Sequence, residues 1–230
     1  MIKYKLILLR HGESKWNLEN KFTGWKDIDL TADGIKEAMN AGELIKKQNI
    51  VFNIAFTSVL KRAIKTMWYI LEQNDLMWIP VHKTFRLNER HYGGLTGLNK
   101  EETANIHGID QVRKWRRSYK TRPPESTNEF DLSLKANKKY SEIKSLPRSE
   151  SLEDTVIRLQ PFIEHSLIKN LNNNNNIIIA AHGNSIRALL KITENISDDD
   201  ISKIEIPTGK PILINYDQKN KKFDKHKYLK

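Results

Sequence analysis

Two histidines stand in matching contexts, each at the end of a short apolar run. His11 follows the run from Leu6 to Leu9 and Arg10, and His182 follows the run from Ile177 to Ala181; a glycine comes directly after each histidine. A neutral imidazole is a competent nucleophile near pH 7, because its ordinary pKa is about 6.5. Arginine offers a planar set of donors that fits phosphate oxygens. One such turn would be an ordinary loop histidine, but two indicate a phosphoryl-transfer site with a histidine nucleophile.

The elements around these turns predict how the two histidines meet. Apolar runs of this length alternate with helix-compatible segments, which is typical of α/β folds. We therefore expect one domain over residues 1–230, a three-layer sandwich with a mostly parallel central sheet flanked by helices. Ligands bind at the carboxyl edge of such sheets, where both histidines would lie.

Individual elements follow from periodicity and capping residues. We expect strands at 4–9, 54–57, 77–81, 177–181 and 211–216, and helices beginning at Thr31, Ser58, Glu101, Ser151 and Ser197. Ser151-Leu-Glu-Asp154 resembles a capping box with aspartate in place of glutamate. Residues 121–146 are polar, contain Pro123-Pro124 and show no clean period. We expect them to form an insertion with little regular structure, which in a compact domain is usually a lid or binding loop.

Three further segments carry charge suited to the same chemistry. Arg62 lies near the start of the helix that follows the strand at 54–57, so it either points at the same sheet edge or is a solvated helix arginine. Glu89 stands among arginines, and is either an ion-pair partner or a general acid/base. Arg116 and Arg117 follow a tryptophan, and are either a basic pair at a helix end or a clamp for a second phosphate.

Composition limits the alternatives. The 230 residues are 38% apolar and 29% charged, with no cysteine and a net charge of +11. The lysines are scattered and often accompany asparagine, so we expect no nucleic-acid partner. No apolar stretch approaches the roughly 20 residues that span a bilayer, and no secretory leader is evident, so we expect a cytoplasmic protein without a membrane partner. No zinc-helix or nucleotide-loop spacing occurs, and we expect no metal.

Longer motifs are more specific than the histidine turns. They are Leu9-Arg-His-Gly-Glu-Ser14 with Trp16-Asn17, Phe22-Thr-Gly-Trp25, Thr57-Ser-Val-Leu-Lys-Arg62, Leu87-Asn-Glu-Arg-His-Tyr-Gly93, Gly97-Leu-Asn-Lys100, Trp115-Arg-Arg117, Ala180-Ala-His-Gly-Asn-Ser185 and Ile206-Pro-Thr-Gly209. Over residues 5–216 the chain resembles the cofactor-dependent phosphoglycerate mutases, which belong to the histidine phosphatase superfamily. The Arg-His-Gly turn points only to the superfamily, whereas Glu-Arg-His-Tyr-Gly with Trp-Arg-Arg points to the mutases.

The resemblance implies roles for matching residues. His11 would carry the phosphoryl group, with Arg10, Arg62 and His182 around it, and Glu89 would be the general acid/base. Substrate-binding positions would be Asn17, Thr23, Gly24, Arg90, Tyr92, Lys100, Arg116, Arg117, Gly183 and Asn184. The implied activity is interconversion of 3-phosphoglycerate and 2-phosphoglycerate in glycolysis and gluconeogenesis. The implied cofactor is 2,3-bisphosphoglycerate, as primer and intermediate, without a metal. A homo-oligomer, dimer or tetramer, is expected from the same resemblance.

Two departures keep an alternative open. Residues 130–140 lack the Pro-Gly-His-Asp-like pattern usual in the mutases, and the chain stops at Lys230 where mutases usually continue into a mobile tail. We therefore expect a mutase with raised phosphatase activity, because an open site admits water to phospho-His11. The alternative is a histidine-type phosphomonoesterase or bisphosphoglycerate phosphatase, which would share His11, Arg10, Arg62 and His182. A basic nucleic-acid-binding module or inactive scaffold has only the net charge in its favour.

Overall fold

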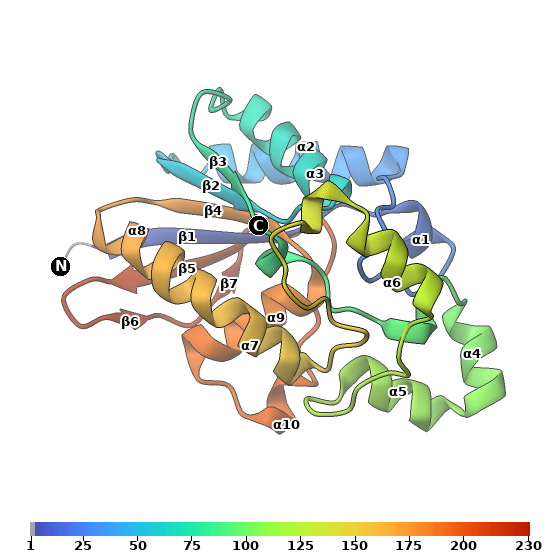
Figure 1. Cartoon of the computed structure of the whole chain (residues 1–230). Coiled ribbons are helices and arrows are strands. Elements are labelled where there is room, and N and C mark those ends of the chain that lie inside the picture. Colours follow the sequence, from blue (N-terminus) through green and yellow to red (C-terminus); the bar gives the residue numbers. More distant parts are fainter. Residues whose placement is uncertain (1–2) are drawn as a thin grey trace.

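A seven-stranded sheet forms the centre of the computed structural model, which describes residues 3–230 (Figure 1). The strand order is β3-β2-β4-β1-β5-β6, and β7 also pairs with β5. The strands are β1 (Lys3–Arg10), β2 (Ile54–Thr57), β3 (Val81–Lys83), β4 (Ile177–Ala181), β5 (Ile212–Asp217), β6 (Lys222–Phe223) and β7 (Lys227–Tyr228).

The sheet is mixed. Strands β3, β2, β4 and β1 run parallel, as the sequence predicts. Strand β5 is antiparallel to β1, and β6 and β7 are antiparallel to β5. The α/β class and the flanking helices are confirmed, and the parallel part of the sheet is the part that precedes the two histidine turns.

Helices cover both faces of the sheet. The longer ones are α2 (Ala32–Lys46), α3 (Lys61–Gln73), α4 (Lys100–His107), α5 (Ile109–Arg117), α6 (Asn128–Lys135), α7 (Leu152–Phe162) and α9 (Gly183–Glu194). The shorter ones are α1 (Lys15–Leu18), α8 (Ile168–Asn172) and α10 (Asp198–Ile201), with single-turn 3₁₀ segments at Phe85–Leu87, Gly93–Leu95 and Lys138–Tyr140 and a π-helical turn at Ile163–Leu167.

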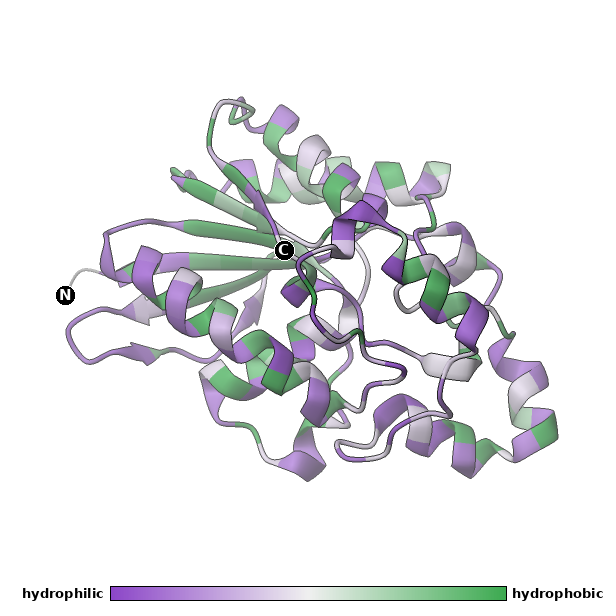
Figure 2. Cartoon of the chain, viewed as in Figure 1, coloured by the Kyte–Doolittle hydropathy of each residue, from purple (hydrophilic) through white to green (hydrophobic). Residues whose placement is uncertain are grey.

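Alternation along β1 explains the two layers, since successive strand residues face opposite sides of a sheet. Leu6 and Leu8 belong to the core cluster that includes α7 and α9, whereas Ile7 and Leu9 belong to the one that includes α2 and α3. The central strands β2 and β4 are accordingly buried along their whole length, and the middle of β1 is apolar on both faces (Figure 2). The helices α4, α5 and α6 lie beyond the carboxyl edge of the sheet (Figure 1).

Local predictions hold best where a cap marks a helix start. The Thr31 hydroxyl accepts from the backbone N–H of Gly34, and Ser151 and Asp154 form the capping box. The helix expected from Ser58 begins at Lys61, because Leu60 is its N-cap.

Three predictions are corrected. The strand expected at 77–81 is wrong: Met77 and Trp78 are exposed, and pairing with β2 begins only at Val81. The strand expected at 211–216 is not the last one, since β6 and β7 follow. The prediction that residues 121–146 have little regular structure is also wrong. They contain α6 and a 3₁₀ turn, because Leu134 and Tyr140 pack against Trp25 in a small core of their own.

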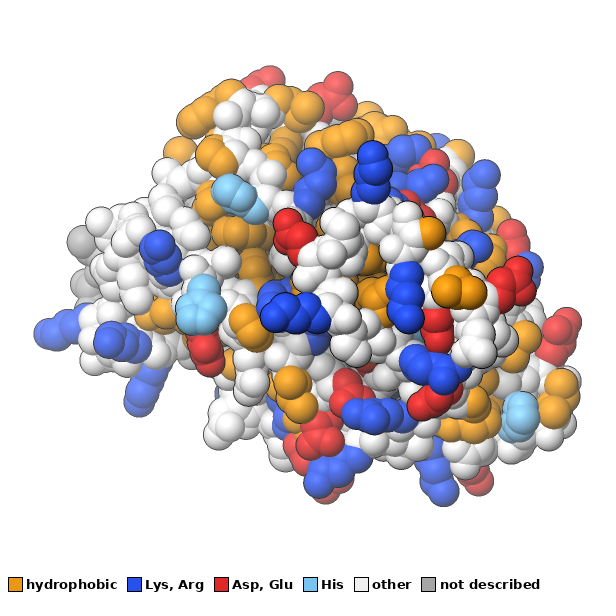
Figure 3. All heavy atoms as spheres, viewed as in Figure 1, with side chains coloured by type: hydrophobic (Ala, Val, Ile, Leu, Met, Phe, Trp, Pro, Cys, Tyr) orange, Lys and Arg blue, Asp and Glu red, His pale blue; other side chains and the backbone are white. Residues whose placement is uncertain are grey.

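Surface charges are interspersed. On the face shown in Figure 3, lysine and arginine side chains alternate with aspartate and glutamate without a continuous basic stripe. None of the helices in residues 3–230 combines the length and hydropathy needed to cross a membrane.

Candidate active site

The two predicted histidines meet at the carboxyl edge of the sheet. Strands β1 and β4 are parallel neighbours with Arg10 opposite Ala181, so the next residue of each strand emerges beside the other. The ring centroids of His11 and His182 are 4.9 Å apart, with 63° between the ring planes. Both rings can therefore face one tetrahedral phosphoryl group.

His11 is held with its Nε2 unprotonated and directed toward Arg62. It is 2% exposed, and its Nδ1 lies 2.7 Å from the carbonyl oxygen of Gly12. A carbonyl only accepts hydrogen bonds, so Nδ1 carries the proton and Nε2 carries the lone pair. Burial, and then the charges of Arg62 and Arg10, hold the pKa of His11 well below its usual value. The ring is therefore neutral and nucleophilic at Nε2 near pH 7.

The turn after His11 packs against helix α2. A Cβ on Gly12 would lie 2.0 Å from the carbonyl oxygen of Gly34, and a Cβ on Gly34 would lie 2.0 Å from the carbonyl oxygen of Glu13. The backbone N–H of Gly12 also donates to the Thr66 hydroxyl on α3 at 3.1 Å. Helices α2 and α3 thus fix the backbone that follows His11.

Arg62 points at the same edge, as the first of its two interpretations predicts. Its Nε donates to Nε2 of His11 at 3.2 Å, and its two terminal nitrogens donate to the carbonyls of Lys26 and Gly24, each at 2.9 Å. Complete burial lowers the pKa of this guanidinium to about 10, which leaves it charged at neutral pH. Arg62 is thus a fixed cation in contact with Nε2 of His11.

His182 offers a second nitrogen to the same place. The ring is fully buried, its Nε2 lies 2.8 Å from the Ser58 hydroxyl, and its Nδ1 has no partner. Burial, together with the charges of Arg62, His11 and Arg10, holds its pKa well below the usual value. A hydroxyl that donates to Nε2 leaves the proton on Nδ1, where it can bind a phosphoryl oxygen.

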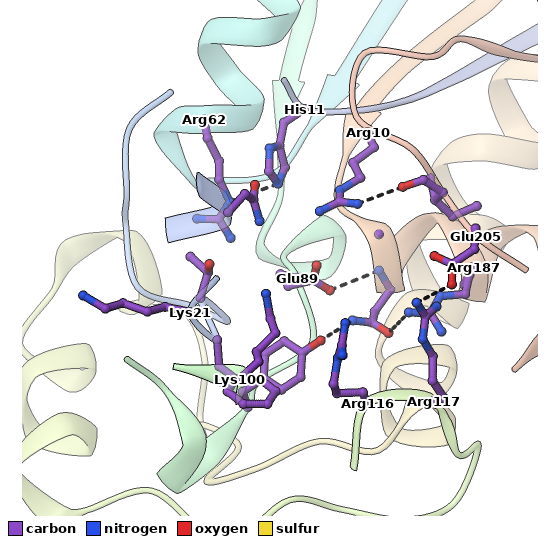
Figure 4. Close-up of a pocket in the computed structure, with 17 residues that line it drawn as sticks. Arg10, His11, Lys21, Arg62, Glu89, Lys100, Arg116, Arg117, Arg187 and Glu205 are labelled. Atoms are coloured by element: carbon purple, nitrogen blue, oxygen red, sulfur yellow. Dashed lines mark hydrogen bonds and ion pairs between the residues drawn. The ribbon is translucent and has the colours of Figure 1, made fainter. Parts of the chain in front are cut away.

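Glu89 lies across the cavity from His11 (Figure 4). Its carbonyl accepts from Trp25 Nε1 at 2.7 Å and from Arg158 Nη2 at 3.2 Å, which fixes the backbone. Its Oε1 accepts the backbone N–H groups of Arg90 at 2.8 Å and Asn184 at 3.1 Å. Burial alone would raise the pKa of this carboxyl, but those donors and the charges of Arg10 and Arg62 lower it overall. The carboxylate is ionised and able to accept a proton.

The far end of the cavity is also cationic. Lys100, Arg116 and Arg117 project into it from the side opposite Arg10 and Arg62 (Figure 4). Asn184 Nδ2 donates to the Tyr92 hydroxyl at 3.1 Å and links the two ends. The cavity measures about 100 Å³. Its lining residues are Arg10, His11, Asn17, Lys21, Phe22, Thr23, Arg62, Glu89, Tyr92, Lys100, Arg116, Arg117, Gly183, Asn184, Arg187, Glu205 and Ile206.

Three of the predicted site residues do not line this cavity. His182 packs edge-on against His11 without belonging to the cavity lining, and the carbonyl of Gly24 is occupied by Arg62. Arg90 is fully buried, with its guanidinium carbon 4.8 Å from the centroid of the Tyr92 ring and its Nη2 donating to the carbonyl of Arg116. Gly24 and Arg90 therefore support the wall from behind.

Three charged residues that the sequence analysis did not assign to the site also line the cavity. They are Lys21, Arg187 and Glu205. Arg187 stands four residues after Gly183, one helical turn along α9, so helical spacing from the second histidine turn could have found it. Glu205 forms an ion pair with Arg117, which no local pattern reveals. Within residues 3–230, no three or more histidine, aspartate or glutamate side chains form a group suited to a metal ion.

Comparisons with known proteins agree with this architecture. The family model described as histidine phosphatase superfamily (branch 1) matches residues 6–228. Among solved structures, a mycobacterial glucosyl-3-phosphoglycerate phosphatase is 19% identical with a TM-score of 0.73, over 97% of each chain. A putative alpha-ribazole-5'-P phosphatase from Escherichia coli is 19% identical with a TM-score of 0.72, over 99% of this chain and 96% of that one. Bacillus stearothermophilus YhfR is 22% identical with a TM-score of 0.72, over 96% and 94%. At identities this low, the similarity to these structures shows a shared fold and nothing further.

Proposed function

Because the chain belongs to the histidine phosphatase superfamily, we propose that it transfers phosphoryl groups through His11 and acts as a phosphoglycerate mutase primed by 2,3-bisphosphoglycerate. The reaction interconverts 3-phosphoglycerate and 2-phosphoglycerate. The observation that carries this proposal is the presence of fixed cations at both ends of one cavity, with Glu89 between them (Figure 4).

The charge of the cavity suits a ligand with two separated anionic groups. Arg10 and Arg62 stand beside His11, while Lys100, Arg116 and Arg117 stand at the far end. A ligand with one phosphate needs only the first group, whereas a phosphoglycerate also carries a carboxylate, and the bisphosphate a second phosphoryl group. Buried donors without partners, at Arg10 Nε and His182 Nδ1, also fit a polyanion such as 2,3-bisphosphoglycerate.

Phosphoryl transfer to substrate then uses groups already in place. With His11 phosphorylated at Nε2, Glu89 accepts the proton of the substrate hydroxyl as that oxygen attacks phosphorus. The Nε2–P bond breaks and the new O–P bond yields the bisphosphate. Arg62, Arg10 and His182 stabilise the charge on the phosphoryl oxygens, which is how fixed donors act in transfer sites.

The return step regenerates the enzyme. His11 attacks the other phosphoryl group through Nε2, and the P–O bond to the sugar-acid carbon skeleton breaks. Glu89 gives its proton to the departing oxygen, so protons balance over the cycle. The far-end cations hold the intermediate while its two phosphates exchange positions.

A second candidate is hydrolysis of phosphomonoesters. The similar solved structures are named as phosphatases, and this supports hydrolysis better than mutase activity. His11, Arg10, Arg62 and His182 would serve both reactions, with water taking the place of the substrate hydroxyl. The far-end cations favour the mutase, since water needs no such clamp.

A coupled enolase assay on 3-phosphoglycerate, with and without 2,3-bisphosphoglycerate, distinguishes the two. We expect turnover that depends on the primer, with little release of inorganic phosphate. Release of phosphate without formation of 2-phosphoglycerate would support the phosphatase and contradict the mutase.

A His11→Asn variant is the control. It should give neither activity nor an acid-labile, base-stable phosphoenzyme, because the nucleophilic nitrogen is lost. Since His11 is buried, its melting temperature should be compared with that of the wild type. Retained label in a folded variant would place the nucleophile elsewhere.

A further inference from the structure

Arg187 is a buried arginine at the cavity wall. It lies on α9, is 6% exposed and lines the cavity that holds His11 and Glu89 (Figure 4). Its Nη2 donates to Asn184 Oδ1 at 2.9 Å, while its Nη1 is buried without a hydrogen-bond partner. One terminal nitrogen of this buried guanidinium therefore has no acceptor for its hydrogen atoms.

No carboxylate of residues 3–230 forms an ion pair with Arg187, nor with the neighbouring buried Arg90. Arg117 does pair, but with Glu205, whose side chain is 71% exposed. A buried charge without a counter-charge is costly to the folded protein. Burial, and next the charge of Arg90, lower the pKa of Arg187 to about 10, so it remains protonated near pH 7. Arg187 therefore has no counter-ion among the described side chains at this end of the cavity.

The position of Arg187 limits which anionic group of a ligand can be its counter-ion. Asn184 connects Arg187 to Tyr92 through its side chain and to Glu89 through its backbone N–H. Arg187 is therefore on the far side of Glu89 from His11, where Arg116 and Arg117 also lie (Figure 4). The group transferred to His11 would be held by Arg10 and Arg62.

We propose that Arg187 is a further ligand-binding residue, and that its counter-ion is the second anionic group of the substrate, the carboxylate or phosphate that is not being transferred. This inference rests on the proposed function. It assigns to Arg187 the part of the binding energy that separates a ligand with two anionic groups from one with a single group.

Two probes test this in the full chain by calorimetric titration. Orthovanadate presents one anionic centre at His11, and 2,3-bisphosphoglycerate presents anionic groups to both ends. Arg187→Gln should weaken binding of the bisphosphate by about 10- to 100-fold, the usual loss for a charged hydrogen-bonding partner. Vanadate binding should change less than about twofold. Arg187→Lys, which keeps the charge without the planar fork, should give an intermediate loss.

Arg113→Gln is the matched control. Arg113 is an exposed arginine on α5, outside the cavity that contains His11. The Arg113→Gln substitution removes the same charge and should change the affinity for either probe by less than about twofold, because exposed charges are screened. An equal loss in this variant would mean that overall charge explains the effect, which would overturn the proposal.

The melting temperature of the ligand-free variant distinguishes binding from support. Removing an uncompensated buried charge should leave the melting temperature of Arg187→Gln unchanged or higher. A lower melting temperature, with both probes weakened equally in the Gln and Lys variants, would make Arg187 a support for Asn184 and would overturn the proposal.

Unchanged bisphosphate affinity in Arg187→Gln would also overturn the proposal, as would wild-type protein that binds only vanadate. Hydrolysis without primer-dependent turnover, but with the expected binding pattern, would contradict only the mutase function.

Discussion

Nε of Arg62 donates a hydrogen bond to Nε2 of His11 across 3.2 Å, so the proposed nucleophile touches its principal cation before any ligand binds. The same guanidinium is fixed by two backbone carbonyls. The positive charge is therefore positioned in advance, and little reorganisation is needed when charge develops on the phosphoryl oxygens.

Arg62→Lys should reduce kcat by about 10²–10³-fold, because a single ammonium nitrogen cannot reach the three acceptors that three separate guanidinium nitrogens contact. The measurement is the rate of phosphoenzyme formation from 2,3-bisphosphoglycerate by rapid quench. Lys61→Gln, one residue earlier and exposed, is the control and should keep the wild-type rate. A near-normal rate in Arg62→Lys would show that charge alone suffices.

Glu89→Gln should slow both formation of the phosphoenzyme from 2,3-bisphosphoglycerate and transfer to the substrate hydroxyl, with kcat lower by about 10²–10⁴-fold. The amide keeps the size of the side chain and can still accept the two backbone N–H groups, but it cannot take a proton. Single-turnover transfer from labelled enzyme to 3-phosphoglycerate measures the step. Unimpaired transfer would reduce Glu89 to an ion-pair partner.

Stability should fall as the pH drops below about 6.5, the usual pKa of histidine. Burial holds the pKa of His11 and His182 well below that value, and burial lowers the pKa of His91 to about 4. The unfolded chain then binds protons that the folded chain does not, so the free energy of unfolding decreases by about 1.4 kcal/mol per pH unit for each such histidine.

Urea unfolding between pH 7.5 and 5.5 measures this slope. His91→Gln should reduce the slope by the share of one histidine, whereas His165→Gln, on an exposed part of the chain, should leave it unchanged. A flat stability profile in the wild type would contradict the buried neutral histidines.

Glu205→Gln should bind 3-phosphoglycerate more tightly, with KM lower by about two- to fivefold, because its carboxylate competes with the ligand for Arg117. The effect is small since Glu205 is mostly exposed. Glu125→Gln is the matched control: Glu125 is 66% exposed and pairs with Arg148 outside the cavity. A KM that rises in Glu205→Gln would mean that the ion pair positions Arg117 for binding.

The sequence predicts elements well where the signal is local. Thr31 and Ser151 mark helix starts through bonds made within one turn, and the apolar runs before His11 and His182 become adjacent strands. It fails where tertiary contacts decide. Residues 130–140 are ordered because Leu134 and Tyr140 pack beside Trp25, over 100 positions away in the chain. The strand predicted at Met77 fails because only Val81–Lys83 finds a partner on β2.

The candidate site shows the same division. Arg10, Glu89 and Arg117 are recognisable from their neighbours in the chain, and the structure lines one cavity with them. Glu205 is a single acid in a plain context, and its effect on Arg117 exists only after folding. The placement of Arg90 behind Tyr92, away from the cavity, is likewise invisible to motif spacing.

The contact between Gly12 and Gly34 leaves no room for a methyl group on either side. Any replacement at Gly34, although it lies on a helix away from the cavity, would push the chain at Glu13 and shift the imidazole relative to its partners. Loss of activity without loss of secondary structure is the expected signature of such a change, and a random mutagenesis screen would register position 34 as if it were an active-site residue.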